Sequence, residues 1–147
     1  MTESAGWLDW RVDLRALVAG VSADWLGTLL TAGLLGVAFG VGPDTPDSRI
    51  EELLAAPEFI ISATVHGSFF TALGGYVAAR LAPADPFRHA VIVGLLSLIL
   101  AILMATSPGE GPAAAWWVDA LGYLLVVPAA AGGGWLAVRR RDEVHPS

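Results

Sequence analysis

The sequence contains no cysteine and no lysine among its 147 residues. Without cysteine, the chain can form no disulfide, offers no thiolate to a metal ion and has no cysteine nucleophile. Charged residues make up only 15% of the chain, against about 25% in typical soluble domains. The net charge of −6 does not provide the basic surface that nucleic acids require, so we expect no nucleic-acid partner.

Motifs for catalysis and for cofactor binding are also missing. The histidines show no pair with the spacing of a metal site, and a single histidine at membrane depth, His66, without a serine or cysteine partner does not make a triad. No glycine-rich loop follows a strand-like segment, so the phosphate-binding motifs are absent. We therefore expect a protein that is not an enzyme and that holds no cofactor or metal.

Apolar residues, in contrast, are abundant. They make up 55% of the chain, and the mean hydropathy is +0.63. Because about 20 apolar residues cross the hydrocarbon core of a bilayer, each long apolar stretch is a candidate transmembrane helix. Four such stretches cover residues 16–41, 59–81, 90–106 and 113–138. We predict an all-α fold, a four-helix transmembrane bundle that forms a single domain over residues 1–147.

The charges between these stretches are sorted by sign. One side of the membrane would carry seven of the eight basic residues: Arg11, Arg15, Arg80, Arg88, Arg139, Arg140 and Arg141. The other side would carry, with Arg49, the acidic residues Asp44, Asp47, Glu51, Glu52, Glu58 and Glu110. Because basic segments are retained in the cytoplasm, both termini are predicted to be cytoplasmic. The predicted location is a bacterial-type plasma membrane, with the lipid bilayer as partner.

The first outer loop, residues 42–58, has a helical pattern of its own. Ser48 and Glu51 have the spacing of a capping box, and Ile50, Leu53 and Leu54 follow as a small apolar face. We predict a short amphipathic helix in this loop.

Small residues recur every four positions along the predicted spans. The positions that we expect to pack helices together are Gly20, Thr28 and Gly36 in the first span and Gly67, Thr71 and Gly75 in the second. In lipid, helices associate closely where such residues let their backbones approach. The rows predict a tight bundle with few cavities. They also predict a face left over for a second copy of the chain or another membrane protein.

Several polar residues lie at membrane depth and could form a network: Asp24, His66, Tyr76, Asp119 and Tyr123. At ~1.5 Å per residue, His66 and Asp119 lie about 10 Å and 9 Å below the outer boundary, so they could pair. Tyr123 lies one turn further in, and Tyr76 is the nearest polar residue to Asp24 by depth. These groups could form hydrogen bonds that hold the helices in register, or a relay for ions or protons.

Segments spread over nearly the whole chain are similar to a group of small bacterial four-span membrane proteins. The matching segments are Asp9-Trp10-Arg11, Asp24 with Gly27, Gly74 to Arg80, and His89-Ala90. The resemblance implies the four-span topology. It implies no activity, because none is established for that group.

Two functions remain open from the residues alone. We favour a non-enzymatic structural or interaction protein that associates through its small-residue helix faces. The alternative is a small ion or proton translocator that uses Asp24, His66 and Asp119. The second requires water between these groups, so a dry interior would argue against it.

Overall fold

The computed structural model describes residues 12–106 and 115–144. Its helices are α1 (Leu14–Ala38), α2 (Asp47–Ala55), α3 (Pro57–Leu81), α4 (Pro86–Ala105) and α5 (Trp116–Val144). All except α2 are long and apolar enough to cross a membrane. The predicted all-α fold with four candidate spans is therefore confirmed, and it suggests a multi-pass membrane protein. Two predicted features, the Asp9-Trp10-Arg11 segment and the start of the fourth span at 113–114, lie outside the described residues.

The first residues of the helices follow from local chemistry. The Asp13 carboxylate caps α1, because its Oδ1 accepts hydrogen bonds from the N–H groups of Arg15 and Ala16 at 2.8 and 3.2 Å. Helices α3 and α4 begin at Pro57 and Pro86, earlier than the predicted residues 59 and 90. Proline is favoured at the first helical position, where its missing N–H costs no hydrogen bond, so both helices extend back to it.

The end of α5 also differs from the prediction, because the helix continues past residue 138 through its arginines to Val144. The Nη2 group of Arg141 donates hydrogen bonds to the backbone carbonyls of Ala79, Arg80 and Ala82. Ala79 and Arg80 lie in the last turn of α3 and Ala82 is its C-cap, so their carbonyls are among those without a helical partner. One arginine thus joins the ends of α3 and α5.

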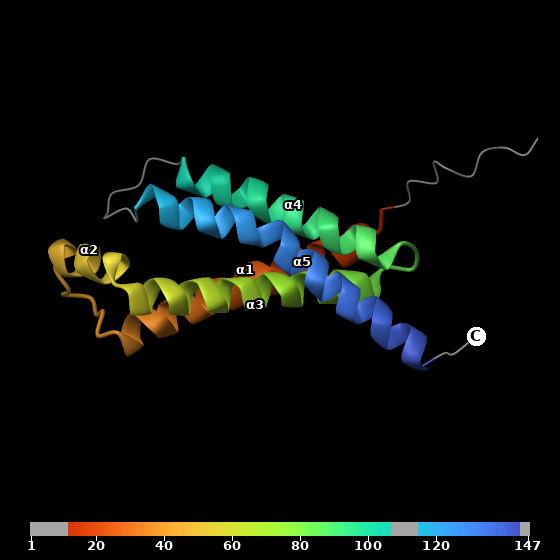
Figure 1. The fold of residues 1–147 in the computed structure, drawn as a ribbon, viewed down its shortest axis with the longest axis horizontal. Helices are drawn as coiled ribbons and strands as arrows, with labels where there is room; N and C mark the ends of the chain where they lie inside the picture. Colours follow the sequence, from red (N-terminus) through yellow and green to blue (C-terminus); the bar gives the residue numbers. More distant parts are fainter. Residues whose placement is uncertain (1–11, 107–114, 145–147) are drawn as a thin grey trace, which may run out of the picture.

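The long helices alternate in direction, and Figure 1 places the start of α1 and the end of α5 at one end of the bundle. Helix α2 lies at the opposite end and packs against α3. Both α1 and α5 contact α3 and α4, but among the described helices α1 and α5 do not contact each other. These two helices are therefore diagonally opposed.

The half of the bundle nearest the termini is densely packed through glycines. A Cβ atom on Gly74 of α3 would lie 2.6 Å from the carbonyl oxygen of Gly20 of α1, so the two backbones touch. Gly75 and Gly133 likewise abut the backbones of Ala130 and Ala72, across the α3–α5 crossing. The fully buried residues of this half include Ala16, Ala78, Ala79, Ala90, Val93, Ala130 and Ala137. Close approach of this kind is how helices associate in lipid.

The other half of the bundle is more open. Added Cβ atoms at Gly67 and Gly122 would meet nothing within 4 Å, and one at Gly36 would meet only Val41. The small-residue rows therefore bring helices together near the termini and leave space at the end that carries α2. The expected packing residues Gly20 and Gly75 lie at helix crossings, whereas Gly36 and Gly67 do not.

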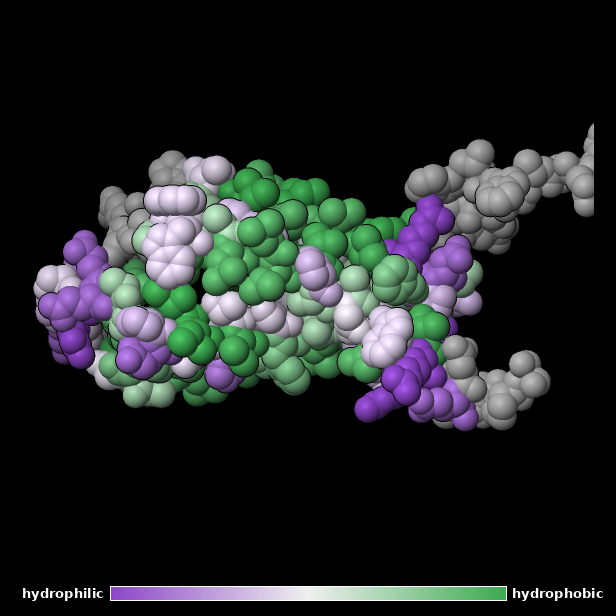
Figure 2. Space-filling view, viewed as in Figure 1, coloured by the Kyte–Doolittle hydropathy of each residue, from purple (hydrophilic) through white to green (hydrophobic). Residues whose placement is uncertain are grey.

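The face seen in Figure 2 has the distribution of a membrane protein, with a mostly green apolar middle and purple polar ends. Large apolar side chains that are exposed on the long helices include Leu26, Leu30, Leu34, Ile61, Val65, Phe69, Leu95, Ile99 and Leu124. Lipid would cover these side chains without cost.

The helix predicted within residues 42–58 is present as α2, and Leu53 is its buried residue. However, α2 begins at Asp47 after Pro46, and its first turn has no side-chain cap hydrogen bond. The predicted capping box between Ser48 and Glu51 is therefore not formed.

Candidate functional site

A cavity of about 330 Å³ lies between the diagonally opposed helices α1 and α5, with α3 and α4 as its other walls. The lining residues nearest the chain termini are Asp24 of α1, Thr71 of α3 and Ser97 of α4. The lining residues at the other end include Asp119, in the exposed first turn of α5. The cavity thus begins where the densely packed half ends, and it extends along the helices toward the end of the bundle that carries α2.

Asp24 forms the floor of this cavity. Its side chain is only 4% exposed, and both carboxylate oxygens accept a hydrogen bond. Thr71 Oγ1 donates to Oδ1 at 2.9 Å, and Ser97 Oγ donates to Oδ2 at 2.5 Å. Three helices therefore meet at one carboxylate. Within the described part of the chain, none of the ion pairs involves Asp24, so no basic side chain offsets its charge.

The walls of the cavity come from regular helix faces. Thr64, Ser68 and Thr71 are spaced by four and three residues, so their hydroxyls share one face of α3. Asp119 and Tyr123 lie one turn apart on α5 and line the opposite wall. At a share of ~30 Å³ per water, the cavity would hold roughly ten water molecules.

The structure brings together some of the predicted network and not the rest. Asp24, Asp119 and Tyr123 line the cavity, and so do three of the expected packing positions, Thr28, Gly67 and Thr71. Thr71 still contacts α1 through its hydrogen bond to Asp24, whereas Gly67 meets no neighbouring helix and leaves space. The interior is therefore dense near the termini and open around this cavity.

His66 and Tyr76 lie elsewhere. His66 is exposed on α3, and its Nδ1 lies 2.7 Å from the carbonyl oxygen of Ser62 in the same helix instead of near Asp119. Tyr76 packs against the buried alanines of the dense half. Asp24 is hydrogen-bonded to Thr71 and Ser97 and not to Tyr76, the neighbour expected from depth along the helix axis.

Sequence reasoning missed Trp25, Thr64, Ser68 and Ser97 as lining residues. The sequence does contain a pattern that indicates two of them, because Thr64 and Ser68 are spaced so that their hydroxyls fall on the same helix face as that of Thr71. For Ser97 there is none, since only the relative register of α1 and α4 places its hydroxyl against Asp24.

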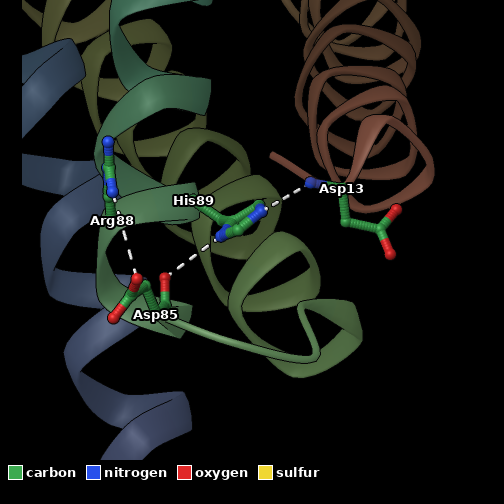
Figure 3. A network of polar contacts seen from close by, with 4 residues as sticks. All are labelled: Asp13, Asp85, Arg88 and His89. Atoms are coloured by element: carbon green, nitrogen blue, oxygen red, sulfur yellow. Dashed lines mark hydrogen bonds and ion pairs between the residues drawn. The ribbon is translucent and has the colours of Figure 1, made fainter. Parts of the chain in front are cut away.

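A second polar cluster joins the helix starts at the opposite end of the bundle (Figure 3). His89 of α4 is 2% exposed, and its Nε2 accepts a hydrogen bond from the backbone N–H of Asp13 at 2.9 Å. Since an N–H can only donate, the ring proton must be on Nδ1, which lies 3.1 Å from the carbonyl oxygen of Asp85. Arg88 lies 3.9 Å from the Asp85 carboxylate. This cluster connects the start of α1 to the start of α4 and is remote from the cavity.

No protein-family model matches the chain, and neither a curated protein nor a solved structure shows significant similarity to it. In the described residues, no group of three or more histidine, cysteine, aspartate or glutamate side chains is placed to hold a metal ion. The cavity and its two carboxylates are therefore the strongest indication of function in the described residues.

Proposed function

We propose that the protein binds a cation in the cavity between α1 and α5 and moves it across a membrane. The observation that carries this proposal is the buried Asp24 carboxylate, which forms the floor of a polar cavity inside an apolar bundle. Ionisable groups within membrane segments are costly and mark ion or substrate pathways. Asp24 would be the inner binding group, and Asp119 would attract the cation at the mouth.

The depth of Asp24 supports translocation. At ~1.5 Å per residue, its Cα lies about 15 Å from the start of α1 at Leu14 and about 21 Å from the end at Ala38. That position is near the middle of a ~30 Å hydrocarbon core, where membrane transporters place their binding sites. A group needed only to hold helices together would have no reason to form the floor of a cavity.

The charge of the cavity supports a cation as the occupant. Its lining contains two carboxylates and no basic side chain. A low-dielectric cleft lined by one sign of charge concentrates ions of the opposite sign. The dense glycine-packed half would close the pathway on the terminal side, so transport requires the contacts of Gly20 with Gly74 to loosen.

The orientation and chemistry of the site complete the proposal. The arginines at the terminal end favour a cytoplasmic location for both termini in a bacterial-type plasma membrane, so the cavity would open outward. We also propose that the protein is not an enzyme. In support, the cavity lining combines carboxylates and hydroxyls without the histidine or cysteine that would activate a nucleophile.

Proteoliposome flux tests this function. We expect purified protein to conduct at least one cation from a panel of H⁺, Na⁺, K⁺ and tetraethylammonium, and Asp24→Asn to abolish that flux. Asp47→Asn on the exposed surface of α2 is the matched control and should leave flux unchanged. Absence of flux for every cation of the panel, or full flux in Asp24→Asn, would contradict the proposal.

A second candidate is self-association, or association with another membrane protein, through the outer part of α1. Gly33 and Gly36 face no neighbouring helix in the monomer, and a small-residue face in lipid is a typical helix-pairing surface. Chemical cross-linking in native membranes tests this candidate. Gly36→Leu should abolish the cross-linked product if α1 pairs there, and a wild-type protein that cross-links neither to itself nor to another membrane protein would remove this candidate.

A further inference from the structure

The cavity combines its carboxylates with aromatic side chains. Trp25 of α1 is adjacent in sequence to Asp24, and Tyr123 of α5 lies one turn beyond Asp119. Both residues line the same cavity, and both are only partly exposed. The faces of tryptophan and tyrosine rings attract cations, most strongly where water is excluded. The cavity therefore offers a cation two kinds of attraction.

The size of the cavity argues against a bare metal ion as its preferred occupant. About 330 Å³ is within the range of small-molecule pockets, roughly 300–1,000 Å³. Asp24 supplies a single carboxylate at the floor, and both of its oxygens already accept hydrogen bonds from hydroxyls. Hard cations need several oxygen ligands at close range, usually including more than one carboxylate, and no cluster of three or more carboxylates or histidines in the described residues is placed to supply them.

The apolar part of the lining argues against a neutral polar solute. Leu29, Val118 and Leu125 contribute to the walls alongside the aromatic rings. An occupant that satisfies this lining must have an apolar body and a positive charge. Small alkylated ammonium ions have both. Because water hydrates them weakly, their transfer into an apolar site costs little free energy of dehydration.

We propose that the occupant of the cavity is a small organic cation of the alkylammonium class. Its charge is directed at Asp24, and its apolar body lies between Trp25 and Tyr123. This inference rests on the proposed function and names the substrate class of the same site.

Isothermal titration of the purified full-length protein with tetraethylammonium tests the inference. We expect saturable binding to the wild type and a loss of affinity of roughly tenfold or more in Asp24→Asn, since a charge interaction is removed. Trp25→Leu should weaken binding by roughly three- to tenfold, as expected for one cation–π contact. Trp135→Leu is the matched control, because Trp135 lies beside Arg139 in the inner part of α5 and does not line the cavity.

Folding is checked separately by gel filtration and thermal unfolding of each variant. Asp119→Asn provides a second charge variant at the exposed mouth of the cavity, and it should weaken tetraethylammonium binding without unfolding the bundle. The inference is overturned if tetraethylammonium does not bind, or if it binds equally well to Asp24→Asn and Trp25→Leu.

The same experiments separate the two proposals. Asp24-dependent flux of an inorganic cation, with no binding of tetraethylammonium, would remove the organic cation and keep the translocator. Asp24-dependent binding of tetraethylammonium without any flux would keep the site and its ligand class and remove translocation.

Discussion

The hydroxyl of Ser97 donates a hydrogen bond to Oδ2 of Asp24 over 2.5 Å, and this bond joins α4 to α1 at the floor of the cavity. The two residues are 73 positions apart in the sequence. Thr71 supplies the matching bond to Oδ1 from α3. The carboxylate is thus held by two hydroxyls on different helices, which aligns three helices at one depth.

Removal of either hydroxyl is expected to destabilise the bundle. Ser97→Ala and Thr71→Val each leave one oxygen of a buried carboxylate without its donor, at a cost of about 1–3 kcal/mol. Equilibrium unfolding in mixed micelles measures the change in the free energy of unfolding. Thr28→Val is the control, because Thr28 lines the cavity without a hydrogen bond to Asp24, and it should change stability by less than about 0.5 kcal/mol.

Two adjacent glycines of α5 are expected to respond differently to the same substitution. A methyl group at Gly133 would overlap the carbonyl of Ala72, whereas one at Gly132 would meet no atom within 4 Å. Gly133→Ala should therefore destabilise the protein by about 1–3 kcal/mol, and Gly132→Ala by less than about 0.5 kcal/mol. Thermal unfolding of the two variants in one detergent decides the matter. Equal stability would mean that α3 and α5 do not cross at Gly133.

His89 should contribute more to stability than His66. In His89→Ala the N–H of Asp13 loses its acceptor and the buried ring leaves a space, so we expect a loss of about 1–3 kcal/mol. The exposed ring of His66 bonds only within its own helix, and His66→Ala should cost less than about 0.5 kcal/mol. Unfolding curves for both variants provide the measurement. A larger effect at His66 would contradict the arrangement in Figure 3.

We predict the orientation in the membrane from the arginines at the terminal end. We expect a reporter fused after Ser147 to be active in the cytoplasm and one inserted in α2 to be active outside, because basic segments are retained inside. Paired fusions of a cytoplasmic and a periplasmic reporter measure this directly. Periplasmic activity from the C-terminal fusion would reverse the assignment.

The four long helices could be predicted from the sequence because hydrophobicity and length alone decide which segments can cross a bilayer. The prediction of a short helix at α2 succeeded for a similar reason, since it rests on a local sequence pattern, and its amphipathic character stays a prediction. The boundaries were less accurate. Prolines at 57 and 86 began helices earlier than the hydropathy indicated, because a proline fits the first helical turn even where the residues around it are polar.

The sequence of a single helix was not sufficient to predict which polar residues face the interior. Asp24, Asp119 and Tyr123 were recognisable as unusual residues at membrane depth, and the structure places all three around one cavity. His66 was equally unusual but faces outward, because the rotation of α3 that brings Gly74 and Gly75 to their crossings turns His66 away. No property of His66 itself reveals that rotation.

The sequence alone thus determined which segments form the long apolar helices, because the hydrophobicity and length of a segment are local properties. The tertiary structure decided where small residues bring helices together and where they leave a cavity. The same spacing of four residues gives a contact at Gly75 and open space at Gly67, because the helices cross near the first and diverge at the second. Crossing points depend on all the helices at once, so the pairing of Asp24 with Ser97 and Thr71 appears only in the assembled bundle.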